Sequence, residues 1–169
     1  MKKVDDSIKD YVSYNPQTGK IHWIKDKGRA KSGDLAGTQE DTGALKLVFN
    51  RRLYKLHRLA WFLYYGVWPK EEIDHINHDK LDNRIINLRE TDRKTNGRNL
   101  PLFTNSLSGV CGVHWFERTQ KWTVSIKVDG RNIRLGYFSN FDEAVKVRKD
   151  AEIKYGFHEN HGKPKETRE

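Results

Sequence analysis

The residues best suited to chemistry lie within 73–99, where aspartate, histidine and asparagine are closely spaced. Asp74 and His75 are adjacent, and Asn87 and Asn96 follow at intervals of twelve and nine residues. Carboxylate and amide oxygens suit Mg²⁺ or a similar divalent ion. A histidine can take a proton from water, and basic neighbours can hold a phosphate. A plainer interpretation stays open, because loops rich in Asp and Asn commonly only form turns.

The spacing of these four residues resembles the HNH nuclease motif, and the upstream segment 57–61 (His-Arg-Leu-Ala-Trp) is also similar to members of that superfamily. The resemblance covers residues 57–99 well and residues 11–56 more loosely. One position departs from the name of the motif, since Asn96 replaces the final histidine, as in many members. Many of these proteins are free-standing homing endonucleases encoded by phages or mobile introns.

The resemblance implies a ββα-metal (His-Me finger) module that cuts double-stranded DNA. Asp74 and Asn96 would bind one divalent ion per active site, Mg²⁺ or Mn²⁺, and His75 would be the general base. Asn87 would hold the hairpin through backbone hydrogen bonds. The products would carry a 5′ phosphate and a 3′ hydroxyl. Because adjacent strand residues face opposite ways, we expect irregular backbone at the pair Asp74–His75.

Four neighbouring residues have weaker interpretations. We expect His78 to be exposed on a loop, and His57 to be a hydrogen-bonded residue at a helix start; neither is expected to be a ligand. Arg93 and Arg98 are candidate DNA contacts because they lie in the basic, helix-compatible run 92–99.

The elements that must position these residues begin with a β-rich region, 1–56, expected to contact DNA. Segments 45–49 and 53–56 flank Asn50-Arg51-Arg52 and predict a hairpin. Residues 57–65 are apolar nearly all round, which predicts a buried helix ending at Gly66. The nuclease core is expected over 57–100 and a linker over 101–107.

A different pattern begins at residue 108. Apolar and polar residues alternate over 121–128, Asp129-Gly130 is a strong hairpin turn, and alternation continues from Ile133 through Tyr137. Residues 139–142 resemble a capping box, and a helical face follows as far as Gly156. The pattern predicts a three-stranded antiparallel sheet packed on one helix over 108–158, then a polar tail over 159–169. The fold class is therefore α+β.

The turn predicts that Lys127 pairs with Asn132 and Ser125 with Arg134, so one sheet face is polar and basic. Such a face suits the major groove of DNA, although a solvated outer face is an equally good interpretation. Residues 108–113, 135–138 and 142–144 resemble the ethylene-response-factor (APETALA-type) DNA-binding domain. Parity places Trp122 in the core. The resemblance implies these DNA contacts: His114, Trp115, Arg118, Lys121, Lys127, Arg131 and Arg134.

Composition restricts the class of protein. The chain has 169 residues, with 32 Lys plus Arg against 23 Asp plus Glu, a net charge of +9 that favours a polyanionic partner. The longest apolar run, 59–65, is too short to cross a membrane. A lone Cys111 excludes an intramolecular disulfide and a zinc site with several thiolates.

We therefore expect a cytoplasmic enzyme of a bacterial or phage-infected cell. It would be a monomer or homodimer and would not bind membranes. A non-catalytic DNA-binding regulator is the alternative.

Overall fold

The computed structural model describes residues 5–92, 97–103 and 106–163, and the chain divides into two compact units, Met1–Thr91 and Asp92–Glu169. The boundary between these units falls inside the segment 57–100 expected to form the nuclease core. Among the helices in the described ranges, none is long and apolar enough to span a membrane.

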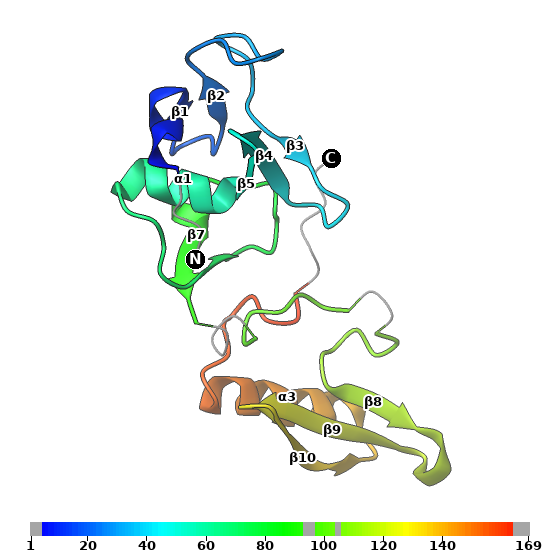
Figure 1. The fold of residues 1–169 in the computed structure, drawn as a ribbon. Helices are drawn as coiled ribbons and strands as arrows, with labels where there is room; N and C mark the ends of the chain where they lie inside the picture. Colours follow the sequence, from blue (N-terminus) through cyan, green and yellow to red (C-terminus); the bar gives the residue numbers. More distant parts are fainter. Residues whose placement is uncertain (1–4, 93–96, 104–105, 164–169) are drawn as a thin grey trace. The chain divides into compact units, whose positions relative to one another are not determined.

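The first unit consists of short strands around one helix (Figure 1). It has three antiparallel sheets, β1–β2, β3–β4–β5 and β6–β7. Its elements in chain order are η1 (Asp6–Asp10), β1 (Val12–Tyr14), β2 (Ile21–Trp23), β3 (Thr38–Gln39), β4 (Leu45–Phe49), β5 (Arg52–Lys55), α1 (Leu56–Tyr65), β6 (Glu72–His75), η2 (Ile85–Asn87) and β7 (Leu88–Thr91).

The β4–β5 hairpin is close to its predicted position. Asn50 and Arg51 both have positive φ, which a two-residue turn between twisted strands requires. The register pairs Phe49 with Arg52, so Arg52 belongs to β5, and Leu56 belongs to the helix instead of the strand.

Helix α1 ends at Gly66, whose left-handed conformation (φ 75°) caps it as predicted. The helix packs against β1, β4 and β5. The prediction that it is buried all round is wrong, because Tyr64 and Tyr65 are about half exposed. Only one face enters the core, which includes Ile8, Ile21 and Phe49 from the strands and turns before it.

The second unit is a three-stranded antiparallel sheet, in the order β10–β9–β8, with one helix packed on it (Figure 1). Its elements are β8 (Val113–Phe116), η3 (Glu117–Thr119), β9 (Lys121–Val128), β10 (Arg131–Phe138) and α3 (Phe141–Lys154). Val113, Val124 and Ala144 are fully buried, and Trp122 packs against them as parity predicts. The helix is capped by Asn140, not Ser139: the Asn140 side chain accepts a hydrogen bond from the Glu143 N–H.

The hairpin register confirms the predicted pairs Lys127–Asn132 and Ser125–Arg134. Beyond Arg134 the register shifts by one residue, so that Gly136 faces Val124. This bulge reverses the parity of the rest of β10. Tyr137 was expected on the apolar face; it is 44 % exposed and pairs with Thr123 on the polar face, while Phe138 turns into the core.

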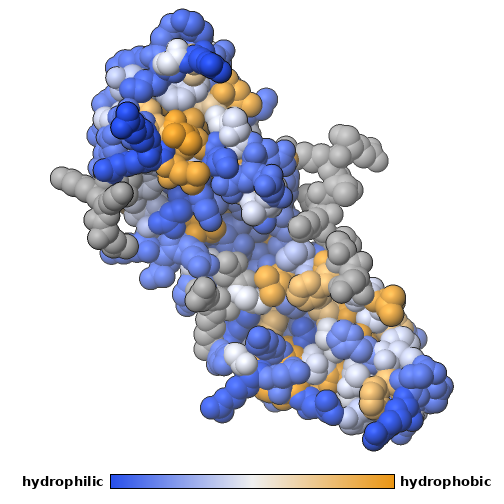
Figure 2. Space-filling model, turned by 45° about the vertical axis from the view of Figure 1, so that its right-hand side comes forward, coloured by the Kyte–Doolittle hydropathy of each residue, from blue (hydrophilic) through white to orange (hydrophobic). Residues whose placement is uncertain are grey.

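Described residues at the start of the expected linker and of the expected tail pack within the second unit. The Leu102 N–H donates to the Lys163 carbonyl at 3.0 Å, and the Gly162 N–H donates to the Leu100 carbonyl at 2.8 Å. His161, predicted to lie in a polar tail, is buried. On the face drawn in Figure 2, the surfaces of both units are largely hydrophilic and are interrupted by apolar patches.

Candidate functional site

The pair Asp74–His75 lies at the end of β6, and the ladder to β7 is regular there. Asp74 faces Arg89 and His75 faces Leu88, with no register shift. The irregular backbone expected at this pair is therefore absent from the ladder, although the strand does end at His75. The two side chains consequently leave the sheet in opposite directions.

His75 is a buried imidazole, 6 % exposed, between two polar partners. Its Nε2 lies 3.0 Å from the Oδ1 of Asn83, and its ring meets the ring of His57 edge-on at a centroid distance of 5.2 Å. Burial lowers the pKa of His75 below its usual 6.5, against smaller opposing effects of Asn83 and Asp74. The imidazole is therefore neutral near pH 7 and is able to accept a proton.

His57 lies in the first turn of α1, as predicted, and its ring packs edge-on against the ring of His75. Burial, followed by the nearby His75, lowers the pKa of His57 to about 3. Both imidazoles are therefore neutral in the folded protein at neutral pH.

Asp74 is a partly shielded carboxylate, with a side chain 13 % exposed. Its Oδ2 accepts hydrogen bonds from Arg89 Nε at 3.1 Å and Nη2 at 2.8 Å. Carboxylate oxygen is a ligand of hard divalent cations, which complete their shells with water and phosphate oxygens. The donor chemistry of Asp74 thus fits such an ion.

The second expected ligand, Asn96, lies outside the described residues, as does Arg93. Within the ranges that the structure describes, no group of three or more His, Cys, Asp or Glu side chains could hold a metal ion.

Asn87 joins the two ends of the loop that follows His75. Its Oδ1 accepts from the Asn77 N–H at 3.0 Å, and its Nδ2 donates to the Asp82 carbonyl at 2.8 Å. Its own carbonyl accepts from the Ile76 N–H at 3.0 Å. The side chain is buried, so these bonds are shielded from water and fix the loop on the β6–β7 hairpin.

Within that loop the structure corrects one expectation and adds one residue. His78 was expected to be exposed, but it is 8 % exposed and has a positive φ of 65°, since the loop turns back on itself there. Asn83, which sequence reasoning missed, is 1 % exposed and touches His75. Its signal in the sequence is weak, because Asn in a turn-rich loop ordinarily indicates only a turn.

The predicted DNA-contacting residues of the second unit do not all lie on the same face of the sheet. The register places His114, Lys121, Lys127 and Arg134 on the face opposite α3. Trp115 lies on the helix side, against Trp122 at a centroid distance of 5.2 Å. Three predicted contacts lie elsewhere: Arg118 in η3, Arg131 at the hairpin end on the helix side by register, and Arg98 beside Asp129 at 3.4 Å.

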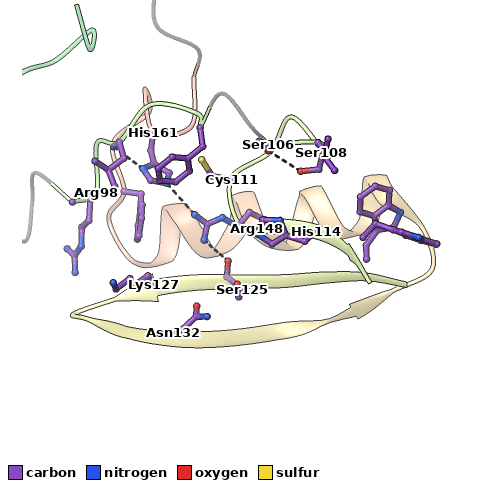
Figure 3. Close-up of a pocket in the computed structure, with 18 of the residues that line it drawn as sticks. Arg98, Ser106, Ser108, Cys111, His114, Ser125, Lys127, Asn132, Arg148 and His161 are labelled. Carbon is purple, nitrogen blue, oxygen red and sulfur yellow. Dashed lines mark hydrogen bonds between the residues drawn. The ribbon is translucent and has the colours of Figure 1, made fainter. Parts of the chain in front are cut away.

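The second unit also contains a pocket of about 1430 Å³ (Figure 3). Its lining combines Ser125, Lys127 and Asn132 of the sheet with residues from the ranges 97–103, 106–112 and 157–161. Arg148 crosses between them, donating to the Ser125 carbonyl at 3.1 Å and approaching His161 at 3.3 Å. Burial raises the pKa of the Cys111 thiol in its wall, so that thiol is not a ready nucleophile.

Comparison with known proteins gives two matches. Residues 54–98 match a family model described as HNH endonuclease. This matched segment includes Asp74, His75 and Asn87. A solved structure, "DNA binding and cleavage by the HNH homing endonuclease I-HmuI", is 25 % identical over 54 % of this chain and 54 % of its own, with a TM-score of 0.42. The chain thus spans about half the length of that structure. No curated protein matches the chain. The family match supports an HNH endonuclease domain over residues 54–98, and with it a nuclease.

Proposed function

We propose that this chain, which carries an HNH endonuclease domain, is a divalent-metal-dependent enzyme that hydrolyses phosphodiester bonds in double-stranded DNA at a preferred site, as homing endonucleases do. The observation that carries the proposal is His75, neutral and buried at the end of β6, one residue after Asp74 in the chain and inside the matched segment 54–98. A neutral imidazole next to a metal-ligating carboxylate supplies the base that hydrolysis requires.

Each residue of the site has a distinct role in the proposal. Asp74 and Asn96 hold one Mg²⁺ or Mn²⁺, which when bound stabilises negative charge on the phosphate and on the leaving 3′ oxygen. His75 takes a proton from the attacking water. Asn87 keeps the loop and the hairpin together through its hydrogen bonds to Ile76, Asn77 and Asp82. The products carry a 5′ phosphate and a 3′ hydroxyl.

Placement on DNA is assigned to the second unit. We propose that it acts as an ethylene-response-factor-like module, with the sheet face opposite α3 in the major groove. That face is basic and polar, and four of the predicted contacts share it: His114, Lys121, Lys127 and Arg134. Long cationic side chains spaced along a sheet can contact phosphates and base edges together.

The proposal is tested by incubating supercoiled plasmid DNA with the purified chain and Mg²⁺. We expect conversion to open circle, with no conversion in EDTA or with His75→Ala. Equal loss of cleavage and of DNA binding in His75→Ala would contradict the role of His75 as base. Binding that is sensitive to salt, but without cleavage of any sequence in a genomic DNA library, would favour the non-catalytic regulator.

The product also reports the oligomeric state. A monomer presents one catalytic centre and is expected to nick one strand, whereas a homodimer presents two and can cut both strands. Direct conversion of supercoiled DNA to linear DNA would therefore indicate a dimer.

A further inference from the structure

Asn83 is the most deeply buried polar residue among those described in the first unit, and none of the roles assigned above includes it. Its side chain is 1 % exposed and its Oδ1 lies 3.0 Å from His75 Nε2. Its Nδ2 is buried and has no hydrogen-bond partner in the described structure. A buried donor without a partner costs stability, so packing alone does not account for an asparagine here.

The backbone of Asn83 is fixed from the other end of the unit, by the turn that joins β1 to β2. The Tyr14 hydroxyl donates to the Asn83 carbonyl at 2.7 Å. The Ile85 N–H donates to the Pro16 carbonyl at 3.2 Å. A Cβ added to Gly19 would lie only 2.5 Å from the Arg84 nitrogen and 2.7 Å from the Asn83 carbonyl carbon. Residues 14–19, which are the last residue of β1 and the turn after it, therefore pack directly against the backbone of residues 83–85.

On the loop side, Asn87 Nδ2 donates to the carbonyl of Asp82, the residue before Asn83. Asn83 is thus held by the strand pair β1–β2, far away in sequence, and by Asn87 of the loop on the β6–β7 hairpin. Its amide is aimed at His75. A neutral imidazole carries its proton on only one of two nitrogens, and the hydrogen-bond partner of one nitrogen decides which.

We propose that Asn83 is a positioning residue for the cleavage reaction: its Oδ1 accepts a hydrogen bond from His75 Nε2–H and so fixes the ring with its lone pair on Nδ1. The inference rests on the proposed function, because the lone pair matters only if His75 takes the proton from water. No bond is made or broken at Asn83 itself.

A reversed amide is the specific competing arrangement. If Asn83 Nδ2 donated to His75 Nε2, the lone pair would be on Nε2 and the proton on Nδ1. The two arrangements differ in one observable, the protonated nitrogen of His75, and that difference can be measured without DNA or metal.

The first measurement is therefore the tautomer of His75 in the full chain, labelled with ¹⁵N at histidine and free of metal, above pH 7. The His75 signals are identified as those missing from His75→Ala. We expect a proton on Nε2 in the wild type. Asn83→Leu, which has a similar volume and no acceptor, should lose this preference, and Asn83→Asp, which keeps an oxygen in place, should retain it.

Cleavage kinetics form the second measurement. Asn83→Leu should lower kcat by about 10- to 100-fold, as expected for a group that orients a reacting side chain, with KM and DNA affinity changed by about twofold or less. Asn83→Asp should recover most of kcat. Leu47→Val, in the core of the same unit, shows what lost stability alone does to the rate.

A wild-type His75 protonated on Nδ1 overturns the inference, and this result does not depend on whether any variant folds. A kcat of Asn83→Leu equal to that of Leu47→Val also overturns it, as does a folded Asn83→Asp that is as slow as Asn83→Leu. A wild type without cleavage but with the expected tautomer contradicts the proposed function instead, so the two failures are distinguishable.

Discussion

Two imidazole rings are in contact inside the first unit, and the protein keeps both neutral. His57 meets His75 edge-on at 5.2 Å, and burial lowers the pKa of each. Two protonated rings in this position would repel each other in a poorly solvated site. The arrangement suits a proton acceptor, because His75 stays unprotonated at neutral pH.

The same arrangement predicts a loss of stability in acid. The pKa of His57 is about 3 in the folded protein against 6.5 for an ordinary histidine. As pH falls through 6.5 the unfolded chain binds a proton that the folded chain does not bind until about pH 3. The free energy of unfolding should therefore fall in this window, by up to about 1.4 kcal/mol per pH unit from this residue.

Urea unfolding at pH 7.5 and pH 5 measures the effect. His57→Gln should reduce the difference between the two pH values, because glutamine does not titrate. His114→Gln, on an exposed strand position, is the matched control and should leave the difference nearly unchanged. An identical pH dependence in wild type and His57→Gln would contradict a neutral, buried His57.

At the residue scale, the types and spacing of Asp74, His75 and Asn87 were enough to predict an HNH motif, and the matched segment 54–98 contains all three. Their catalytic and metal-binding roles stay predictions. Asn83 could not be found in this way. Its contact with His75 depends on the loop turning back, on the bonds of Asn87 and on the turn 14–19, none of which a local pattern contains. The burial of His78 was missed for the same reason.

At the element scale, the β1–β2 turn is more than a connection, because it packs on the loop that carries Asn83. Gly19 has a φ of 72° and lies against the backbone of Asn83 and Arg84. Gly28 has a similar φ of 61° but nothing within 4 Å of an added Cβ. An alanine at Gly28 would lose stability only through its left-handed backbone conformation. An alanine at Gly19 would lose stability through that conformation and also through the steric clash with residues 83 and 84.

We expect Gly28→Ala to lower the free energy of unfolding by about 1 to 2 kcal/mol, the cost of a left-handed alanine. Gly19→Ala should cost about 2 to 5 kcal/mol, since the added methyl also displaces backbone. Urea unfolding of both variants gives the comparison. Equal losses would mean that the turn does not press on residues 83–85.

The β9–β10 hairpin shows how far pattern reasoning extends along an element. The Asp129-Gly130 turn fixed the parity, and the pairs nearest to it are as predicted. The bulge after Arg134 interrupts that parity and brings Tyr137 to the polar face. The alternation of polar and apolar residues does not reveal where a strand gains an extra residue. Gly136 was the sequence feature that could have indicated a bulge here.

The polar face of this sheet leads to a test by salt dependence. Lys127 is exposed on the face opposite α3, and Lys146 is exposed on the helix itself. If the sheet contacts DNA, Lys127→Ala should make the slope of log K for DNA binding against log salt less steep by about 0.9, which is the loss of one phosphate contact. Lys146→Ala removes the same charge and should change the slope little. Fluorescence anisotropy at several salt concentrations gives both slopes, and equal slopes would argue against this face.

At the scale of the whole molecule, the proposed chemistry and the proposed placement on DNA belong to different units. Asp74, His75 and Asn87 lie in the unit that ends at Thr91, and the basic sheet lies in the unit that begins at Asp92. Both units contribute to an excess of Lys and Arg over Asp and Glu, so each is able to bind a polyanion without sequence preference. Preference for a site requires contacts to base edges or to DNA shape, which we assign to the sheet.

Removal of residues 108–169 should therefore change DNA affinity and site preference more than the rate of cleavage. This truncation keeps Asn96, the expected metal ligand, in the chain. The truncated protein should bind DNA at least about tenfold more weakly, because all the base and phosphate contacts proposed for the sheet are lost. Its kcat at saturating DNA should change by no more than about threefold, since His75 and Asp74 are retained. Its cleavage should also spread over many positions. Mapping the ends of the cleaved strands in a random library, for wild type and truncation side by side, measures this spread. An unchanged set of cleavage positions would show that the first unit selects the site, and the sheet would then need another role.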